Sequence, residues 1–142
     1  MANVEALPAA FRLDQALQAG LSKEQVYKLR DTGVLEAAGR GVYIQTGLID
    51  PSLAPLVAAS LRQSLATLCL TSALVRHGLS DEIPVQTDIA LPRRTRPPAG
   101  FKHVAWHVFA PETFNVGREE LAVADTHVSI YSPERTIVDV FR

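Results

Sequence analysis

The sequence predicts an α+β fold, in which a small helical part with a β-hairpin precedes an α/β domain with a mixed or antiparallel sheet. Three observations support it: a helix start signal at Ser22, two strand-like segments separated by glycine within residues 34–44, and several β-like segments after residue 85. The 142 residues are 47% hydrophobic and 20% charged with a net charge of −1, which is typical of a globular chain that can bury a core.

The clearest local signal is a capping box. Ser22 can accept a hydrogen bond from the backbone N–H of Gln25, and the Gln25 side chain can return a bond to the backbone of Ser22. This pattern predicts a helix over about residues 23–32, and Gly33 is placed to end it. A shorter helix is expected over residues 14–19.

A hairpin should follow this pair of helices. Residues 34–37 and 41–44 are strand-like and flank Ala38-Gly39-Arg40, where glycine would supply the positive φ of the turn. Two helices joined by a glycine turn and followed by a hairpin make a winged helix-turn-helix. We therefore predict such a domain over residues 1–47, with Arg40 near the tip of the wing.

Two further expectations concern this first domain. A first helix should form near residues 4–7 and pack across the others through Phe11. On the helix of residues 23–32, Val26 and Leu29 face inward. The exposed candidates for contacts with phosphates or base edges are Lys23, Gln25, Tyr27, Lys28 and Arg30 on that helix, together with Arg40 on the wing.

The charge balance leaves an alternative open for these residues. Residues 1–50 hold five Lys and Arg against six Asp and Glu, so 5 − 6 gives −1, whereas DNA-binding domains usually carry a basic excess. The candidates are therefore either a DNA surface made by clustering or ordinary solvated positions on a packed helical pair.

The second domain is expected over residues 52–142 and to continue beyond them. A helix should run to about residue 63, residues 66–70 are either strand or helix, and a short helix should start at Thr71 or Ser72 and end at Gly78. Strands are predicted over residues 85–91, 102–109, 119–124 and 127–131, the last two as an antiparallel pair. A final helix should begin at Ser132-Pro133 and dock Ile137, Val138 and Phe141 on the sheet. Within the strand of residues 102–109, the face with Val104, Trp106 and Val108 is the expected core face.

A basic, proline-rich loop follows the first of these strands. Arg93, Arg94 and Arg96 lie within four residues and are suited to phosphate contacts. The alternative is a solvated surface loop that proline keeps extended.

No pattern indicates catalysis. The chain has no HExxH, CxxC, phosphate loop or nucleophile elbow. His103 and His107 would share a strand face but lie about 13 Å apart, too far to bind one metal ion. His77 precedes a terminating glycine and should contact the helix C-terminus, while Arg135 and Asp139 would form a weak i,i+4 ion pair. We expect no catalytic residues, no metal, no cofactor and no enzymatic activity.

Four stretches in order resemble the AbiEi family of antitoxins and transcriptional regulators from type IV toxin–antitoxin systems: AGLS with TGVLEAAGRGVYI within residues 19–44, LTSALVRHGL at 70–79, DIALPRR at 88–94 and YSPERTIVD at 131–139. The resemblance implies a regulator that binds operator repeats in double-stranded DNA and represses its own operon. It also implies a nucleotidyltransferase-like toxin as a possible partner, and a chain that continues past Arg142.

The sequence also bears on the cellular location of the protein and on two alternative functions. Cys69 is the single cysteine, which excludes an internal disulfide, and no signal peptide or membrane-length apolar run is present, so we expect a cytoplasmic protein, monomeric or homodimeric. One alternative is a winged-helix protein-interaction module that does not bind DNA, which the near-neutral charge favours. Another is the N-terminal part of a nucleic-acid enzyme.

Overall fold

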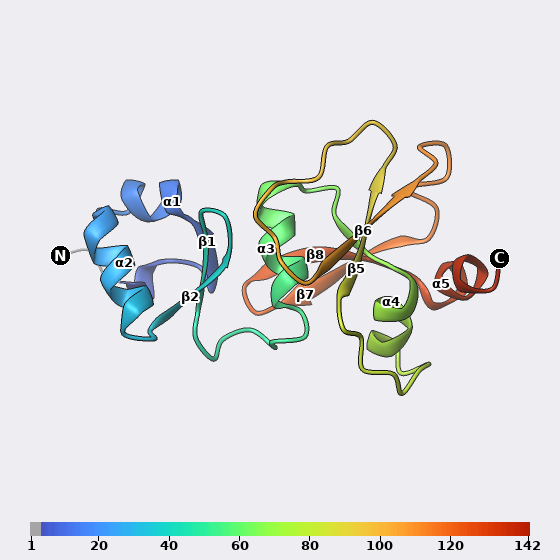
Figure 1. The fold of residues 1–142 in the computed structure, drawn as a ribbon, viewed down its shortest axis with the longest axis horizontal. Helices are drawn as coiled ribbons and strands as arrows, with labels where there is room; N and C mark the ends of the chain where they lie inside the picture. Colours follow the sequence, from blue (N-terminus) through green and yellow to red (C-terminus); the bar gives the residue numbers. More distant parts are fainter. Residues whose placement is uncertain (1–3) are drawn as a thin grey trace.

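The computed structural model describes residues 4–142 and confirms the α+β class. Two sheets are present among these residues, one of three strands and one of five. In chain order the elements are η1 (Val4–Ala6), β1 (Ala10–Arg12), α1 (Leu13–Gln18), α2 (Lys23–Asp31), β2 (Leu35–Gly39), β3 (Val42–Gln45), α3 (Ala54–Arg62), β4 (Thr67–Leu68), α4 (Leu70–Arg76), β5 (Thr87–Pro92), β6 (Val104–Phe109), β7 (Arg118–Val123), β8 (Thr126–Tyr131) and α5 (Pro133–Val140). Figure 1 shows α1 and α2 at one end of the molecule, α5 at the other, and α3 between the two sheets.

The capping box at the start of α2 is confirmed. The Ser22 hydroxyl accepts a hydrogen bond from the Gln25 backbone N–H at 3.1 Å, and Gln25 Oε1 accepts one from the Ser22 N–H at 2.8 Å. Gly33 follows the helix with φ +85°, a conformation that favours glycine. Val26 is fully buried, so α2 packs through the face that its sequence predicts.

The hairpin forms, but its turn lies one residue later than expected. β2 continues to Gly39, and the turn is made by Arg40 and Gly41, whose φ is +72°. Gly39 is instead a point of close approach: a Cβ atom there would lie 2.3 Å from the ring of Phe101. The sequence Gly-Arg-Gly offers two glycines for one turn, and a contact with a distant residue decides between them.

The helix expected near residues 4–7 is wrong for the described residues. Val4–Ala6 form a single 3-10 turn, and the chain then enters β1, which pairs antiparallel with β3; residues 1–3 lie outside the described part. Pro8 interrupts the segment before a helix of useful length can form. Phe11 is fully buried as predicted, although it anchors a strand rather than a helix.

One apolar core connects the two sheets through α3. Four consecutive residues of this helix, Leu56, Val57, Ala58 and Ala59, are buried. The helix can be buried on more than one side because it packs on the three-stranded sheet and on the five-stranded sheet. The core joins Ala9, Ala10 and Ile44 to residues such as Leu68, Ile89 and Ile130. The division at residues 47–52 stays a prediction, and this contact positions the two parts relative to each other.

The larger sheet is mixed, in the strand order β6-β5-β4-β8-β7. Residues 67–68 form a two-residue strand at its centre, which decides between the two expectations for residues 66–70. β4 pairs antiparallel with β5 and parallel with β8, and β5 pairs parallel with β6. The antiparallel pair of β7 and β8 is confirmed. No helix of the described residues has the length and apolarity needed to cross a membrane.

The expectation for the face of α5 is wrong. Ile137, Val138 and Phe141 are 43%, 55% and 79% exposed, so they do not dock on the sheet. The helix turns Arg135, Thr136 and Asp139 inward instead: Thr136 is fully buried, and the side chains of Arg135 and Asp139 are 12% and 8% exposed. Hydrogen bonds from Arg135 to the carbonyls of residues 113 and 116 hold the helix in this orientation.

Two smaller expectations also need correction. On β6, Val104 and Trp106 pack against the main core as predicted, but Val108 is exposed and Phe109 stacks on Tyr131 at 5.7 Å. Every residue of β6 is partly or largely exposed, so neither face of this strand is covered along its whole length. His77 places Nε2 2.8 Å from the carbonyl oxygen of Tyr131, so its ring binds β8 rather than the end of its own helix.

Candidate nucleic-acid interface

The candidate residues of α2 are all exposed. Lys23 and Lys28 form no ion pair in the part of the chain that the structure describes. The guanidinium of Arg30 lies 4.8 Å from the centre of the Tyr27 ring, and its Nε is 3.2 Å from an Asp31 carboxylate oxygen. A cation–π contact and an exposed ion pair are both weak, so Arg30 could exchange them for a phosphate.

Gln25 is less available than the other candidates on this helix. Its Oε1 already accepts a bond from the Ser22 backbone, and a base contact through that oxygen would break the capping box. Residues 23–31 carry Lys23, Lys28 and Arg30 against two acidic residues, so 3 − 2 gives only +1. The helix alone therefore provides little of the electrostatic attraction that DNA binding requires.

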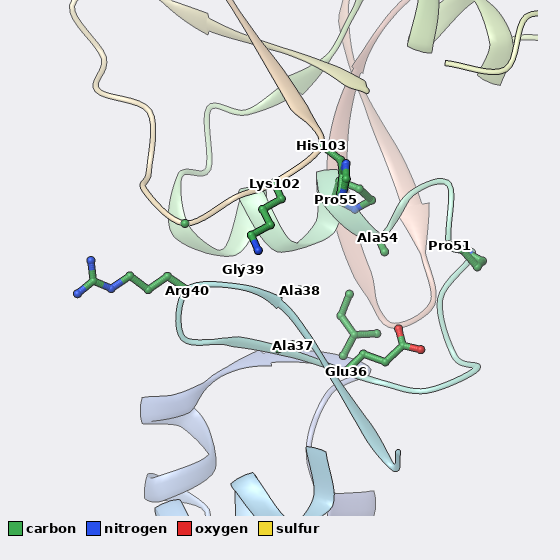
Figure 2. A pocket seen from close by; sticks show the side chains of 12 residues that line it. Glu36, Ala37, Ala38, Gly39, Arg40, Pro51, Ala54, Pro55, Lys102 and His103 are labelled. Atoms are coloured by element: carbon green, nitrogen blue, oxygen red, sulfur yellow. The ribbon is translucent and has the colours of Figure 1, made fainter. Parts of the chain in front are cut away.

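Arg40 lies in the turn between β2 and β3, and its backbone is held from the second part of the chain. Its carbonyl oxygen accepts a hydrogen bond from Arg62 Nη1 at 3.2 Å. A Cβ atom on Gly100 would lie 2.5 Å from Arg40 Cβ, so the backbone of the loop between β5 and β6 packs directly on the turn. Figure 2 shows the Arg40 side chain extending away from the neighbouring elements. The turn is thus fixed while its guanidinium stays exposed.

The predicted basic loop connects β5 to β6, and Arg93, Arg94 and Arg96 are all exposed on it. Arg94 has a φ of +72°. The far end of the loop reaches the wing turn through Gly100 and Phe101, and Phe101 packs edge-on against Trp106 with ring centres 6.4 Å apart. The structure therefore brings the loop and Arg40 together, whereas α2 lies at the outer end of the molecule (Figure 1).

A cleft of about 590 Å³ lies between β2, the start of α3 and the end of this loop. Small residues form most of its wall, and Figure 2 shows Lys102 extending into the gap from the loop while Glu36 lies at the opposite end on β2. The residues that line it include neither a hydroxyl nor a thiol group. The cleft therefore offers no nucleophile of the serine, threonine or cysteine type.

Two arginines that the sequence did not single out belong to the same region. Arg12 Nη1 donates a hydrogen bond to the Leu61 carbonyl at 3.4 Å, and its Nε lies 3.1 Å from Asp14. Arg62 ends α3 and reaches the wing turn. No sequence spacing signals this grouping, because Arg12, Arg40 and Arg62 come from three elements far apart in the chain.

Titratable side chains inside the second part have structural contacts. Asp88 accepts hydrogen bonds from the Ser72 N–H and hydroxyl at 3.2 Å each, and His107 Nε2 lies 2.9 Å from its other oxygen. These bonds join the start of α4 to β5 and β6. Burial raises the pKa of the Cys69 thiol well above its usual range, which keeps it protonated and unreactive. The described residues contain no group of three side chains arranged to hold a metal ion.

Comparisons with known proteins concern the family of the second part of the chain and its fold. The family model of the AbiEi antitoxin C-terminal domain matches residues 66–142, which are 77 of the 142 residues. No curated protein matches the chain. Among solved structures, the crystal structure of the RV2827C protein from Mycobacterium tuberculosis is similar, with a TM-score of 0.61 and 20% identity. The similarity covers 75% of this chain and 42% of that one, so this chain spans less than half of that protein. At this identity the similarity shows the fold alone.

Proposed function

The chain belongs to the AbiEi antitoxin family, and from this premise we propose that it is a transcriptional regulator that binds its operator as double-stranded DNA. The observation that carries the proposal is the exposed helix α2, with Lys23, Tyr27 and Lys28 on its surface, followed by a hairpin that presents Arg40. Helix, turn, helix and hairpin in this order are the parts of a winged helix-turn-helix.

In this proposal α2 enters the major groove and the hairpin is the wing. Lys28 and Tyr27 reach base edges or the adjacent backbone, because both are exposed on the same helix. Arg40 meets a phosphate beside the groove. Gln25 serves mainly to cap the helix, since its side-chain oxygen is engaged by the backbone of Ser22.

Membership of an antitoxin family also supports a place in a toxin–antitoxin system. We propose that the regulator represses its own operon and that residues 66–142, where the family model matches, carry the antitoxin part. The sequence resemblance points to a nucleotidyltransferase-like toxin as the partner.

A second candidate is a protein-interaction module that does not bind DNA. The net charge of −1 over residues 1–50 and of only +1 over residues 23–31 favours it. The two functions differ in a direct measurement, because a protein-binding module should retain any DNA only weakly and without sequence preference.

The test is fluorescence anisotropy with a labelled duplex from upstream of the chain's own gene and an unrelated duplex of equal length, each at two salt concentrations. We expect salt-sensitive binding that prefers the upstream duplex. Lys28→Ala should weaken it, and the matched control Arg76→Ala, on exposed α4 surface, should not. Equal, weak binding of both duplexes would contradict the proposal and favour the interaction module.

A further inference from the structure

A groove runs between α1, the wing turn and the end of α3. It has a volume of about 610 Å³, and its charged lining residues are Arg12, Arg40 and Arg62 with one acid, Asp14. The acid is exposed and pairs with Arg12 at 3.1 Å. The groove thus carries 3 − 1, or +2, and adjoins the basic loop at Arg40.

Charge is strongly segregated between this region and the rest of the molecule. The groove and residues 93–100 together hold six arginines and one aspartate, which gives +5. The remaining residues hold 14 − 6, or 8, basic and 15 − 1, or 14, acidic side chains, which gives −6. The groove and the loop that meets it at Gly100 therefore carry a local basic excess, which the overall charge of −1 and that of residues 1–50 do not indicate.

Arg12 and Arg62 are both held by backbone carbonyls, and Arg12 also pairs with the exposed Asp14. Arg62 uses Nη1 for the Arg40 carbonyl, and Arg12 uses Nη1 for the Leu61 carbonyl. A bond to a neutral carbonyl orients the guanidinium without cancelling its charge. The pair of Arg12 with Asp14 is exposed and therefore weak, so a phosphate can replace it. The same bonds connect the N-terminal part to α3, so the fold sets the spacing between Arg12, Arg62 and the backbone of Arg40.

We propose that this groove binds the phosphodiester backbone of the operator duplex beside the segment that α2 reads, so that α3 of the second part belongs to the DNA-binding surface. The proposal rests on the proposed function. Arginine matches phosphate because its planar group can donate two parallel hydrogen bonds. Figure 1 shows α1, the β2–β3 turn and the β5–β6 loop along one side of the molecule, where a single extended polyanion can reach all three.

The experiment compares the salt dependence of binding to the labelled upstream duplex for the unaltered chain, Arg12→Gln, Arg62→Gln and the control Arg76→Gln. Each groove variant should weaken binding of the upstream and the unrelated duplex by similar factors, because phosphate contacts carry no base information. The slope of log K against log salt should fall by about 0.9 for each lost phosphate contact. Arg76→Gln should leave the slope unchanged.

The Arg62→Lys variant distinguishes the effect of the positive charge of Arg62 from the effect of its hydrogen bond to the wing turn. Lysine keeps the positive charge but cannot reproduce the geometry of the bond to the Arg40 carbonyl. If Arg62 binds phosphate, the lysine variant keeps most of the slope that Arg62→Gln loses. If Arg62 only supports the wing, both variants lose affinity with no difference in slope between them, which overturns the proposal. Circular dichroism confirms that each variant is folded.

The outcomes also separate this proposal from the function on which it rests. If the unaltered chain does not prefer the upstream duplex, the regulator function fails. If it does prefer that duplex and all groove variants keep its slope, the function stands and the groove proposal is overturned.

Discussion

Replacing Arg135 by methionine should lower the free energy of unfolding by about 3–5 kcal/mol. Arg135 Nε lies 2.8 Å from Asp139 Oδ2, and the two side chains are only 12% and 8% exposed. An exposed pair at this spacing would contribute about 0.3–0.5 kcal/mol. The larger effect arises because methionine leaves the Asp139 carboxylate buried without a partner. The carbonyls of Thr113 and Val116 lose the donor that orients α5 as well; because these two bonds are exposed, their loss adds less than the loss of the Asp139 pair.

Urea unfolding followed by circular dichroism measures this loss. Arg30→Met is the matched control, because Arg30 pairs with Asp31 at the surface, where the side chains are 40% and 69% exposed, and its cost should stay below about 0.5 kcal/mol. The double variant Arg135→Met with Asp139→Leu should regain most of the loss, since no unpaired charge remains. Equal, small losses for Arg135→Met and Arg30→Met would refute the reasoning.

Two further predictions concern contacts inside the fold. Gly39→Ala should destabilise the chain by about 1–3 kcal/mol, because the added Cβ would lie 2.3 Å from the Phe101 ring. Adding Phe101→Leu to this variant should recover part of the lost melting temperature. If the melting temperature does not recover, the Phe101 ring is not the cause of the destabilisation. Burial raises the pKa of Tyr131 to about 12. Because this folded pKa exceeds the unfolded value of about 10, the contribution of Tyr131 to the free energy of unfolding is complete below pH 10 and is lost as the pH rises toward 12. Absorbance at 295 nm should show a late ionisation step that Tyr131→Phe removes, and persistence of that step in the variant would assign it elsewhere.

The features that could be predicted from the sequence are those fixed by near neighbours. The bounds of α2 follow from Ser22, Gln25 and Gly33, which lie within the helix or next to it. The exposure of Lys23 and Lys28 follows from the same periodicity. The β7–β8 pair was predictable because its turn and both strands are consecutive.

Other features depend on residues far away in the chain. The inward face of α5 is set by bonds from Arg135 to carbonyls 22 and 19 residues earlier, which no helical pattern within α5 reveals. The position of the wing turn depends on Phe101, and the basic groove depends on Arg62 reaching the carbonyl of Arg40. The sequence thus indicated most of the candidate residues of α2, the wing and the loop, but not that the wing and the loop meet.

The shared core has a consequence for experiments with fragments. Ala9, just before β1, and Ala10 and Ile44 of the small sheet are buried in the cluster that also holds Leu56 of α3 and residues of the larger sheet. Expressing residues 1–47 alone would uncover this apolar face, and exposed faces of this kind promote self-association. Such a fragment would both self-associate and lack Arg62, and either effect could be mistaken for a property of the helix-turn-helix. Binding studies on this protein should therefore keep the wing and α3 in one polypeptide.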